Sequence, residues 1–203
     1  MKHAVILLAL VAVLAQAQDS ITATASPSTL RPGQTATITL TLAGTPPIAG
    51  VQWLLSAPPG WTVGTTTASS AVTSASKQVT CGAPVCFVWG LNITPVPNGA
   101  VATVPVTVPT GTAAGTVQLS VTNTAGATPA GVLQAVTGVP VTVTVLSVYD
   151  INGDGQITTA DVNLIVAQVA SGTCANDVVG NGQCNVLQVI AEVIAWTNAG
   201  SKP

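Results

Sequence analysis

Residues 150–161 read DINGDGQITTAD, and this twelve-residue stretch constrains the fold more than any other part of the chain. Oxygen-bearing side chains recur at alternate places, at Asp150, Asn152 and Asp154, and the turn-forming Gly155 follows them. Ca²⁺ takes about six to eight oxygen ligands around one point, and alternate residues of a tightly curled loop can supply them. The stretch therefore predicts a calcium-binding loop that leads into a helix.

Three further residues complete the expected ligand set. Gln156 would contribute its backbone carbonyl oxygen, and Thr158 a hydroxyl or a bound water. Asp161 would close the site from the first turn of the next helix. Three of the six acidic residues of the chain lie in this loop, which disfavours the alternative of a solvated acidic turn.

The N-terminal segment has the pattern of a secretory signal peptide. Lys2 and His3 form a short basic start, residues 4–14 are apolar without a break, and residues 15–17 read Ala-Gln-Ala, a small-residue cleavage site. The apolar run is too short to span a bilayer. We expect residues 1–17 to be removed and the mature chain to be secreted or held at the cell surface without a membrane span. The alternative is an interfacial or buried helix.

Residues 18–147 have the pattern of an all-β domain. Val, Ile, Leu and Ala alternate with Thr, Ser and Gln, and Gly, Pro and Asn punctuate the runs at the spacing of a β-sandwich. No Asp or Glu lies between residues 20 and 149, so we expect a neutral outer face rich in hydroxyl groups. The expected strands are 21–26, 35–42, 51–57, 71–80, 85–91, 101–108, 115–123 and 139–146.

The C-terminal part, residues 148–203, repeats one loop-and-helix unit. The first unit is residues 150–170, and the second starts as DVVGNGQCNVLQ and spans residues 177–199. In the second loop, Val179 replaces an oxygen ligand and Gln188 replaces the closing acid. We therefore predict one strong calcium site, in the first loop, and a weak second loop. The candidate ligands of the second loop are Asp177, Asn181, Gln183 and Asn185.

The residues before Asp150 are β-like and rich in threonine, so the loops lack the incoming helices of an EF-hand. A pair of EF-hand-type loops without incoming helices, at the C-terminus of an exported chain, resembles a dockerin. The resemblance covers residues 149–198. It implies calcium binding and docking onto a cohesin domain in an extracellular assembly, most often one that degrades polysaccharides. The partner contacts that it implies are Thr159 and Ala160 in the first unit and Val186 and Leu187 in the second.

The N-terminal part resembles a cohesin. The resemblance is carried by RPGQTATITLTL (31–42), GTPPIAGVQWLLS (44–56) and PPGWTV (58–63). Cohesins often show a PG-x-T segment before an alternating strand, and then a Gly-rich turn into a strand with an inward aromatic residue. The resemblance implies a mainly β protein, with a jelly-roll sandwich over residues 18–147 followed by the small helical module. That class of sandwich is related to carbohydrate-binding modules, so both docking and glycan binding are implied.

The inventory of titratable side chains argues against an enzyme. General acid–base catalysis needs a pair of titratable groups in one site. After residue 17 the chain has no histidine, one tyrosine (Tyr149) and one glutamate (Glu192), and four of its five aspartates are at loop ligand positions. Lysine and arginine number only four in a chain of net charge −2, which leaves no basic patch for nucleic acid.

Four cysteines bracket two short segments. Cys81 and Cys86 flank one turn, and Cys174 and Cys184 flank another. Two local disulfides are the simplest of the three possible connectivities in an exported chain. A zinc site is the alternative, and it is disfavoured because no histidine lies after residue 3.

Tryptophan faces can stack on sugar rings. Trp61 follows PPG in a turn-like stretch and is a candidate carbohydrate contact, whereas Trp53 and Trp89 lie within apolar runs and are expected in the core. The leading hypothesis is an exported, non-catalytic, calcium-binding adaptor that docks onto another protein or onto copies of itself. The alternative is a carbohydrate-binding or adhesive sandwich, capped by the calcium module.

Overall fold

The computed structural model describes residues 19–45, 47–82, 84–173 and 175–200. The predicted signal peptide and Cys174 lie outside the described residues. Within the ranges described, no helix has the length and apolar character needed to cross a membrane.

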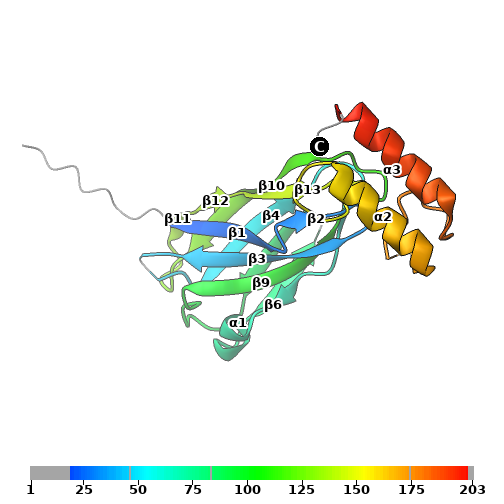
Figure 1. Ribbon diagram of the computed structural model, residues 1–203. Coiled ribbons are helices and arrows are strands. Elements are labelled where there is room, and N and C mark those ends of the chain that lie inside the picture. The colour runs from blue at the N-terminus through cyan, green and yellow to red at the C-terminus, as the bar shows by residue number, and fades with distance from the viewer. Residues whose placement is uncertain (1–18, 46, 83, 174, 201–203) are drawn as a thin grey trace, which may run out of the picture.

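The described chain is mainly β and folds as a sandwich of two sheets (Figure 1). The strands of the first sheet are β1 (Ser20–Ser26), β3 (Thr35–Ala43), β5 (Thr62–Val63), β6 (Thr67–Ala68), β9 (Gly99–Thr107) and β12 (Thr137–Val139). The strands of the second sheet are β2 (Thr29–Leu30), β4 (Gly50–Ser56), β7 (Gln78–Gly82), β8 (Val85–Trp89), β10 (Gly115–Ala127), β11 (Leu133–Ala135) and β13 (Val141–Val145).

The first sheet has the order β12-β1-β3-β9-β5, with β6 also paired to β9. The second has the order β2-β13-β10-β4-β8-β7, with β11 also paired to β10. Most pairs are antiparallel, and the exceptions are β1 with β12 and β13 with β2. The β-sandwich predicted from the sequence is therefore confirmed.

Period-two alternation builds the core. Successive side chains of a strand point to opposite faces of the sheet, so every second residue can be buried. Ala36, Ile38, Leu40 and Leu42 of β3 are all buried, and Trp53 of β4 is fully buried among them. The intervening threonines of β3 point away from the core, which gives the first sheet its hydroxyl-rich outer face.

One predicted strand is wrong over part of its length. Residues 71–80 were expected to form a continuous strand, but α1 (Ser70–Ser74) takes its first half and β7 begins only at Gln78. The Ser69 side chain caps this short helix by accepting a hydrogen bond of 3.3 Å from the backbone N–H of Val72. A serine that satisfies the first free N–H groups favours a helix start over an extended chain.

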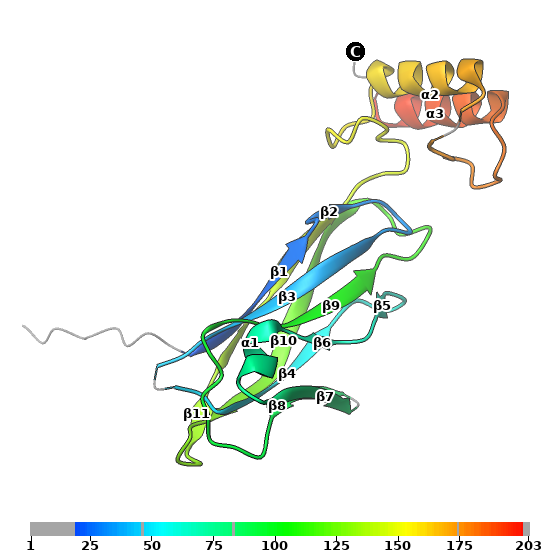
Figure 2. The same cartoon turned by 90° about the horizontal axis from the view of Figure 1, so that it is seen from below.

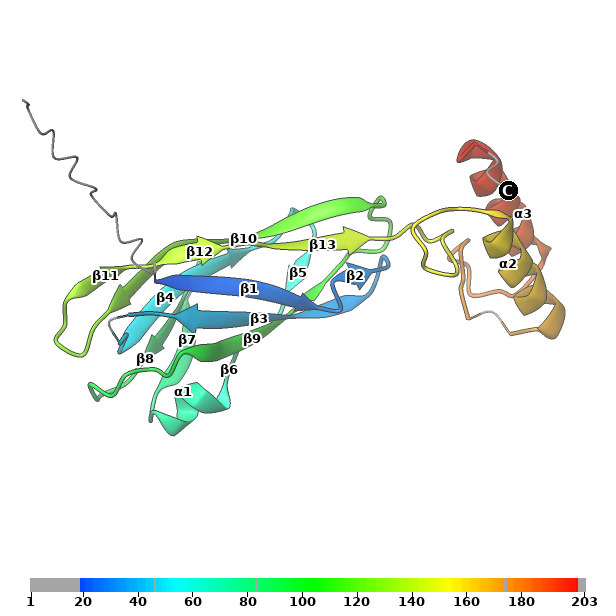
Figure 3. The same cartoon turned by 60° about the vertical axis from the view of Figure 1, so that its left-hand side comes forward.

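Two helices follow the sandwich, α2 (Thr159–Ser171) and α3 (Val186–Asn198). They pack side by side beyond the end of the sandwich that carries β2 and β13 (Figures 2 and 3). A second small core, separate from that of the sandwich, forms around Ile151, Ile165 and Val178.

Candidate functional site

An apolar groove of about 510 Å³ lies on the outer face of the second sheet. Val51 and Trp53 of β4 and Val88 of β8 point into the core, so their neighbours along each strand point outward. The groove is lined by Gly50, Val51, Gln52, Thr80, Phe87, Val88, Trp89, Ala125, Gly126, Ala127 and Leu133. None of these residues carries a charge.

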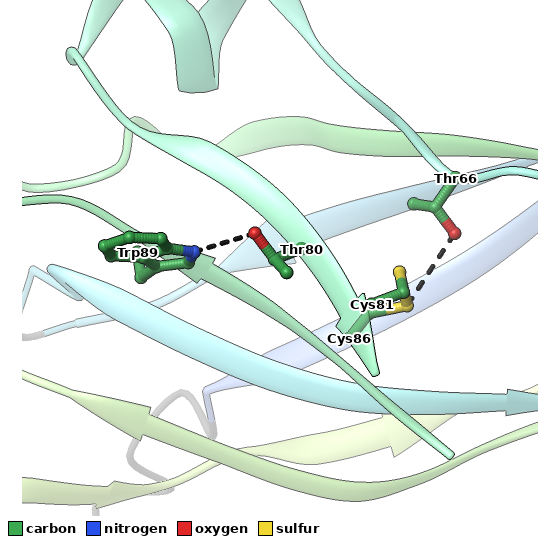
Figure 4. The surroundings of a disulfide bond; sticks show 5 residues. All are labelled: Thr66, Thr80, Cys81, Cys86 and Trp89. Carbon is green, nitrogen blue, oxygen red and sulfur yellow. Dashed lines mark hydrogen bonds between the residues drawn. A yellow bond between two sulfur atoms is a disulfide. The ribbon is translucent and has the colours of Figure 1, made fainter. Parts of the chain in front are cut away.

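Two aromatic side chains that line this groove are partly exposed to solvent. Phe87 is 41% exposed and Trp89 is 43% exposed. The Trp89 indole Nε1 donates a hydrogen bond of 2.9 Å to Thr80 Oγ1, which ties the ring to the neighbouring strand (Figure 4). The sequence-based prediction that Trp89 belongs to the core is therefore wrong, whereas the same prediction for Trp53 is confirmed. Trp61 is half-buried against the core and does not line the groove.

A disulfide holds the hairpin that presents these rings. Cys81 of β7 and Cys86 of β8 are directly opposed in the antiparallel pair and are joined at an S–S distance of 2.02 Å. Thr66 Oγ1 lies 3.7 Å from Cys86 Sγ on the inner side of the hairpin (Figure 4). This confirms the first predicted disulfide. Cys184 is also disulfide-bonded, but its predicted partner Cys174 lies outside the described residues, so that pairing stays a prediction.

The first loop curls around the Asp150 carboxylate. Asp150 is buried, and its Oδ1 accepts hydrogen bonds from the backbone N–H groups of Gly153 and Asp154, at 2.8 and 3.1 Å. Its Oδ2 accepts one of 2.8 Å from Gly155. Gly155 has a φ of +86°, a left-handed conformation that glycine adopts at little cost.

The Asp161 carboxylate ties the same loop to the start of α2. It is fully buried, and its Oδ1 accepts hydrogen bonds of 2.8 and 3.0 Å from the backbone of Ile151 and Asn152. Its Oδ2 accepts hydrogen bonds from the N–H and hydroxyl of Thr158, the residue that caps α2. Burial raises the pKa of Asp161, but these hydrogen bonds outweigh it and leave the pKa below its ordinary value.

The structure brings the six predicted ligand residues of residues 150–161 together in one compact, hydrogen-bonded loop. Asp154 completes it by accepting hydrogen bonds from the Asn152 side chain and from the backbone of Gln156, at 2.9 and 2.8 Å. The donor set consists of hard oxygen atoms, which fits Ca²⁺ by its chemistry. The carboxylates face N–H groups, however, and the described residues contain no group of three His, Cys, Asp or Glu side chains that could hold a metal ion. The calcium site stays a prediction.

Glu192 of α3 is a further acid near the first loop, and the sequence pattern does not identify it as a functional residue. It occupies the place in the second unit that Ile165 has in the first, and both side chains are fully buried. Neither Glu192 carboxylate oxygen has a hydrogen-bond partner among the described residues. Burial, followed by the negative charges of Asp161 and Asp150, raises the pKa of Glu192 to about 7. A buried carboxylate without a partner is costly, so this region favours added positive charge.

The second loop has the same backbone form with fewer acids. Asp177 accepts hydrogen bonds of 2.8 and 2.6 Å from the backbone of Gly180 and Gly182, as Asp150 does in the first loop. Asn185, a predicted ligand, instead caps α3 by accepting a hydrogen bond of 2.9 Å from Leu187. The side chain of Gln183 is exposed.

The helices carry apolar side chains on their outer surface. Of the predicted partner contacts, Val186 is 61% exposed and Leu187 is 48% exposed, while Thr159 is half-buried and Ala160 is exposed. We call the exposed apolar residues of α3 the α3 apolar face. Its members are Val186, Leu187, Ile190, Val193 and Ile194. The two helices therefore do not bury their apolar stripes fully against each other or against the sandwich.

Comparison with known proteins shows which fold the sandwich resembles. The sequence matches no protein-family model, and no curated protein matches it. Among solved structures, the chain is similar to a non-cellulosomal cohesin from the hyperthermophilic archaeon Archaeoglobus fulgidus, at 16% identity and a TM-score of 0.51, over 64% of this chain and 93% of that one.

Two further structures agree. A cohesin module from a Clostridium perfringens family 33 glycoside hydrolase matches at 13% identity and a TM-score of 0.53, over 63% of this chain and 96% of that one. A chain of the Coh-OlpA-Doc918 cohesin–dockerin complex from Clostridium thermocellum matches at 15% identity and a TM-score of 0.52, over 64% of this chain and all (100%) of that one. At these identities the likeness shows the fold alone: the sandwich is cohesin-like.

Proposed function

We propose that this chain is an exported, non-catalytic docking protein whose sandwich binds a protein partner through the groove on β4, β8 and β10. The observation that carries the proposal is the pair of exposed aromatic rings, Phe87 and Trp89, in an apolar groove on an open sheet face. Large aromatic side chains on a rigid support supply much contact area and lose little conformational entropy when they bind. The Cys81–Cys86 hairpin is such a support.

The absence of charge in the groove defines the partner's chemistry. Burying a charged side chain against this surface would leave the charge without a partner, which is costly. We therefore infer a partner with an uncharged, apolar face. A loop–helix module of the dockerin type fits this description, and solved cohesin–dockerin complexes are among the structures that share the sandwich fold.

We further propose that the C-terminal module is dockerin-like and binds one Ca²⁺ in its first loop. The residues that would hold the ion are Asp150, Asn152, Asp154, Gln156, Thr158 and Asp161. Two features support this. All of the ligand atoms would be oxygen atoms of one curled loop. The Glu192 carboxylate, which has no hydrogen-bond partner among the described residues, is also subject to the negative charges of Asp161 and Asp150. Bound calcium would supply positive charge at the start of α2.

Glycan binding is the second candidate. Trp89 presents an exposed ring in a groove that the polar residue Gln52 also lines, and a ring combined with a hydrogen-bonding group can hold a sugar. The sugar contact would then lie at Trp89 rather than at Trp61, because Trp61 is half-buried against the core.

The test uses the full chain immobilised on a sensor surface in the presence of calcium. The probes are purified dockerin modules and, separately, soluble cellulose and xylan fragments. Docking predicts saturable binding of at least one dockerin module and its loss in Phe87→Ser and Trp89→Ser. The matched control is Val63→Ser, which removes an equally exposed apolar side chain from the other sheet. Binding of sugar fragments alone, with the same mutational pattern, would replace docking with glycan recognition.

A further inference from the structure

The Gln188 side chain lies at the centre of the second loop. It belongs to the first turn of α3 and is fully buried, which is unusual for a long amide side chain. Its Nε2 donates a hydrogen bond of 2.7 Å to Asp177 Oδ1 and one of 2.8 Å to the backbone carbonyl of Gln183. The same nitrogen lies 3.5 Å from Asn181 Oδ1.

These three oxygens are the ones that a cation would be expected to contact. Asp177, Asn181 and Gln183 stand at the first, fifth and seventh places of the loop, which are ligand places in a calcium-binding loop. The distances from Nε2 to the Asp177 and Gln183 oxygens are those of hydrogen bonds and exceed calcium–oxygen distances, which are about 2.3–2.6 Å. The NH₂ group, the positive end of the amide dipole, therefore takes the place in which a cation would lie.

The oxygen of the same amide replaces the carboxylate that closes the first loop. Gln188 aligns with Asp161, whose Oδ1 accepts hydrogen bonds from the backbone at the start of the first loop. In the second loop, Gln188 Oε1 accepts one of 3.2 Å from the backbone N–H of Val179. One neutral side chain thus fastens the loop to α3 and also meets the inward-facing oxygens.

The geometry points to a second loop that is closed by its own chain and has no need of a metal ion: the Gln188 amide replaces both the cation and the closing acid. The residues present do not fit a bound Ca²⁺, because Nε2 fills the centre and only Asp177 supplies a negative charge. This inference concerns the second loop alone and does not depend on docking or on calcium in the first loop. It means that one half of the helical module keeps its form whether or not calcium is present.

An isosteric change tests it. Gln188→Glu replaces the donating nitrogen with a carboxylate oxygen of the same shape, so two acids face each other until a cation separates them. In chelator, we expect the backbone amides of Val179 and Gly182 to exchange with solvent faster by about tenfold or more, as when a buried hydrogen bond is lost. Added calcium should restore their protection, and calorimetry should count one more bound Ca²⁺ per chain than in the wild type.

Two other variants make the test decisive. Gln118→Glu makes the same chemical change on an exposed side chain of β10, outside both loops, and should alter neither the exchange nor the calcium count. Gln188→Met keeps the length but removes donor and acceptor, and should lose protection in calcium and chelator alike. The wild type should keep the protection of Val179 and Gly182 in chelator.

Three results would overturn the inference. The first is a wild-type second loop that loses its protection in chelator. The second is a Gln188→Met variant with wild-type protection. The third is a Gln188→Glu variant that calcium does not restore, since a cation would then be unable to stand in for the amide.

Discussion

Arg31 and Ile151 connect the sandwich to the helical module: Arg31 Nη2 donates a hydrogen bond of 3.0 Å to the Ile151 carbonyl oxygen. Arg31 follows β2, and Ile151 is the second residue of the first loop. One of the few charged side chains in the sandwich is therefore directed at the backbone of that loop. Its positive charge also opposes the rise in the pKa of the buried Glu192.

Replacing Arg31 with methionine should loosen the first loop. The change removes a hydrogen bond from a charged donor, and because Arg31 is only partly buried we expect a loss of about 1 kcal/mol in the unfolding free energy of the module. Hydrogen exchange at residues 150–156 measures it. Arg31→Lys keeps the charge and loses the planar fork, so wild-type exchange in that variant would assign the effect to charge alone.

Glu192 should make the module less stable as the pH rises. Its folded-state pKa is raised from 4.5 to about 7, so between these values the folded chain holds a proton that the unfolded chain has lost. The free energy of unfolding is therefore highest below pH 4.5. It falls by about 1.4 kcal/mol per pH unit as the pH rises from 4.5 to about 7. Denaturation of the full chain in chelator, from pH 4.5 to 8, measures it. Glu192→Gln should flatten this slope, and an unchanged slope would contradict the assignment.

Asp161→Asn should abolish strong calcium binding. The substitution keeps the side-chain size and removes one of the three acids of the first loop. Both Asp161 carboxylate oxygens accept backbone hydrogen bonds, whereas an asparagine has only one accepting oxygen. Calorimetry should show the loss of the single strong site. Asp177→Asn makes the same change in the second loop and should leave that site intact. Equal loss in both variants would mean that the loops bind calcium together.

Removal of the Cys81–Cys86 disulfide should weaken the groove. Its short closed loop predicts a loss of about 2 kcal/mol by the chain-entropy model. The double Cys81→Ser, Cys86→Ser variant should also release the Trp89 indole from Thr80, which tryptophan fluorescence and the affinity for the docking probe would both report. An unaltered affinity would show that the hairpin holds the rings without its covalent link.

Much of the fold can be predicted from the sequence, because the alternation of apolar and hydroxyl-bearing residues shows which side chains of a strand are buried. In β3 that alternation is strict, and strand and buried face follow directly. In β8 both faces carry apolar residues, so the pattern does not reveal that Val88 points inward while Phe87 and Trp89 point outward. The tertiary structure decides between the two directions, because it places β8 between β4 and β7 with Val88 against the core.

The C-terminal module also has some features that the sequence predicts and others that depend on tertiary structure. The ligand spacing of the first loop is a local property, and the structure brings those residues into one loop. The roles of Gln188 and Glu192 are not local. A sequence shows that Gln188 replaces an acid, but the position of its amide depends on where α3 begins relative to Asp177. The burial of Glu192 depends on how α2 and α3 pack, which no apolar stripe specifies.

The groove and the α3 apolar face lie toward opposite ends of the long axis of the molecule, as the positions of β8 and α3 show (Figures 2 and 3). Occupants of these two surfaces would stand a sandwich length apart and would not compete for space. A contact between the groove of one copy and the helices of the next would join unlike patches, so it would lack two-fold symmetry. It would leave a free surface at each end of the series unless the series closed into a ring. If docking joins copies in this way, each added copy would lengthen the assembly along the long axis of the molecule.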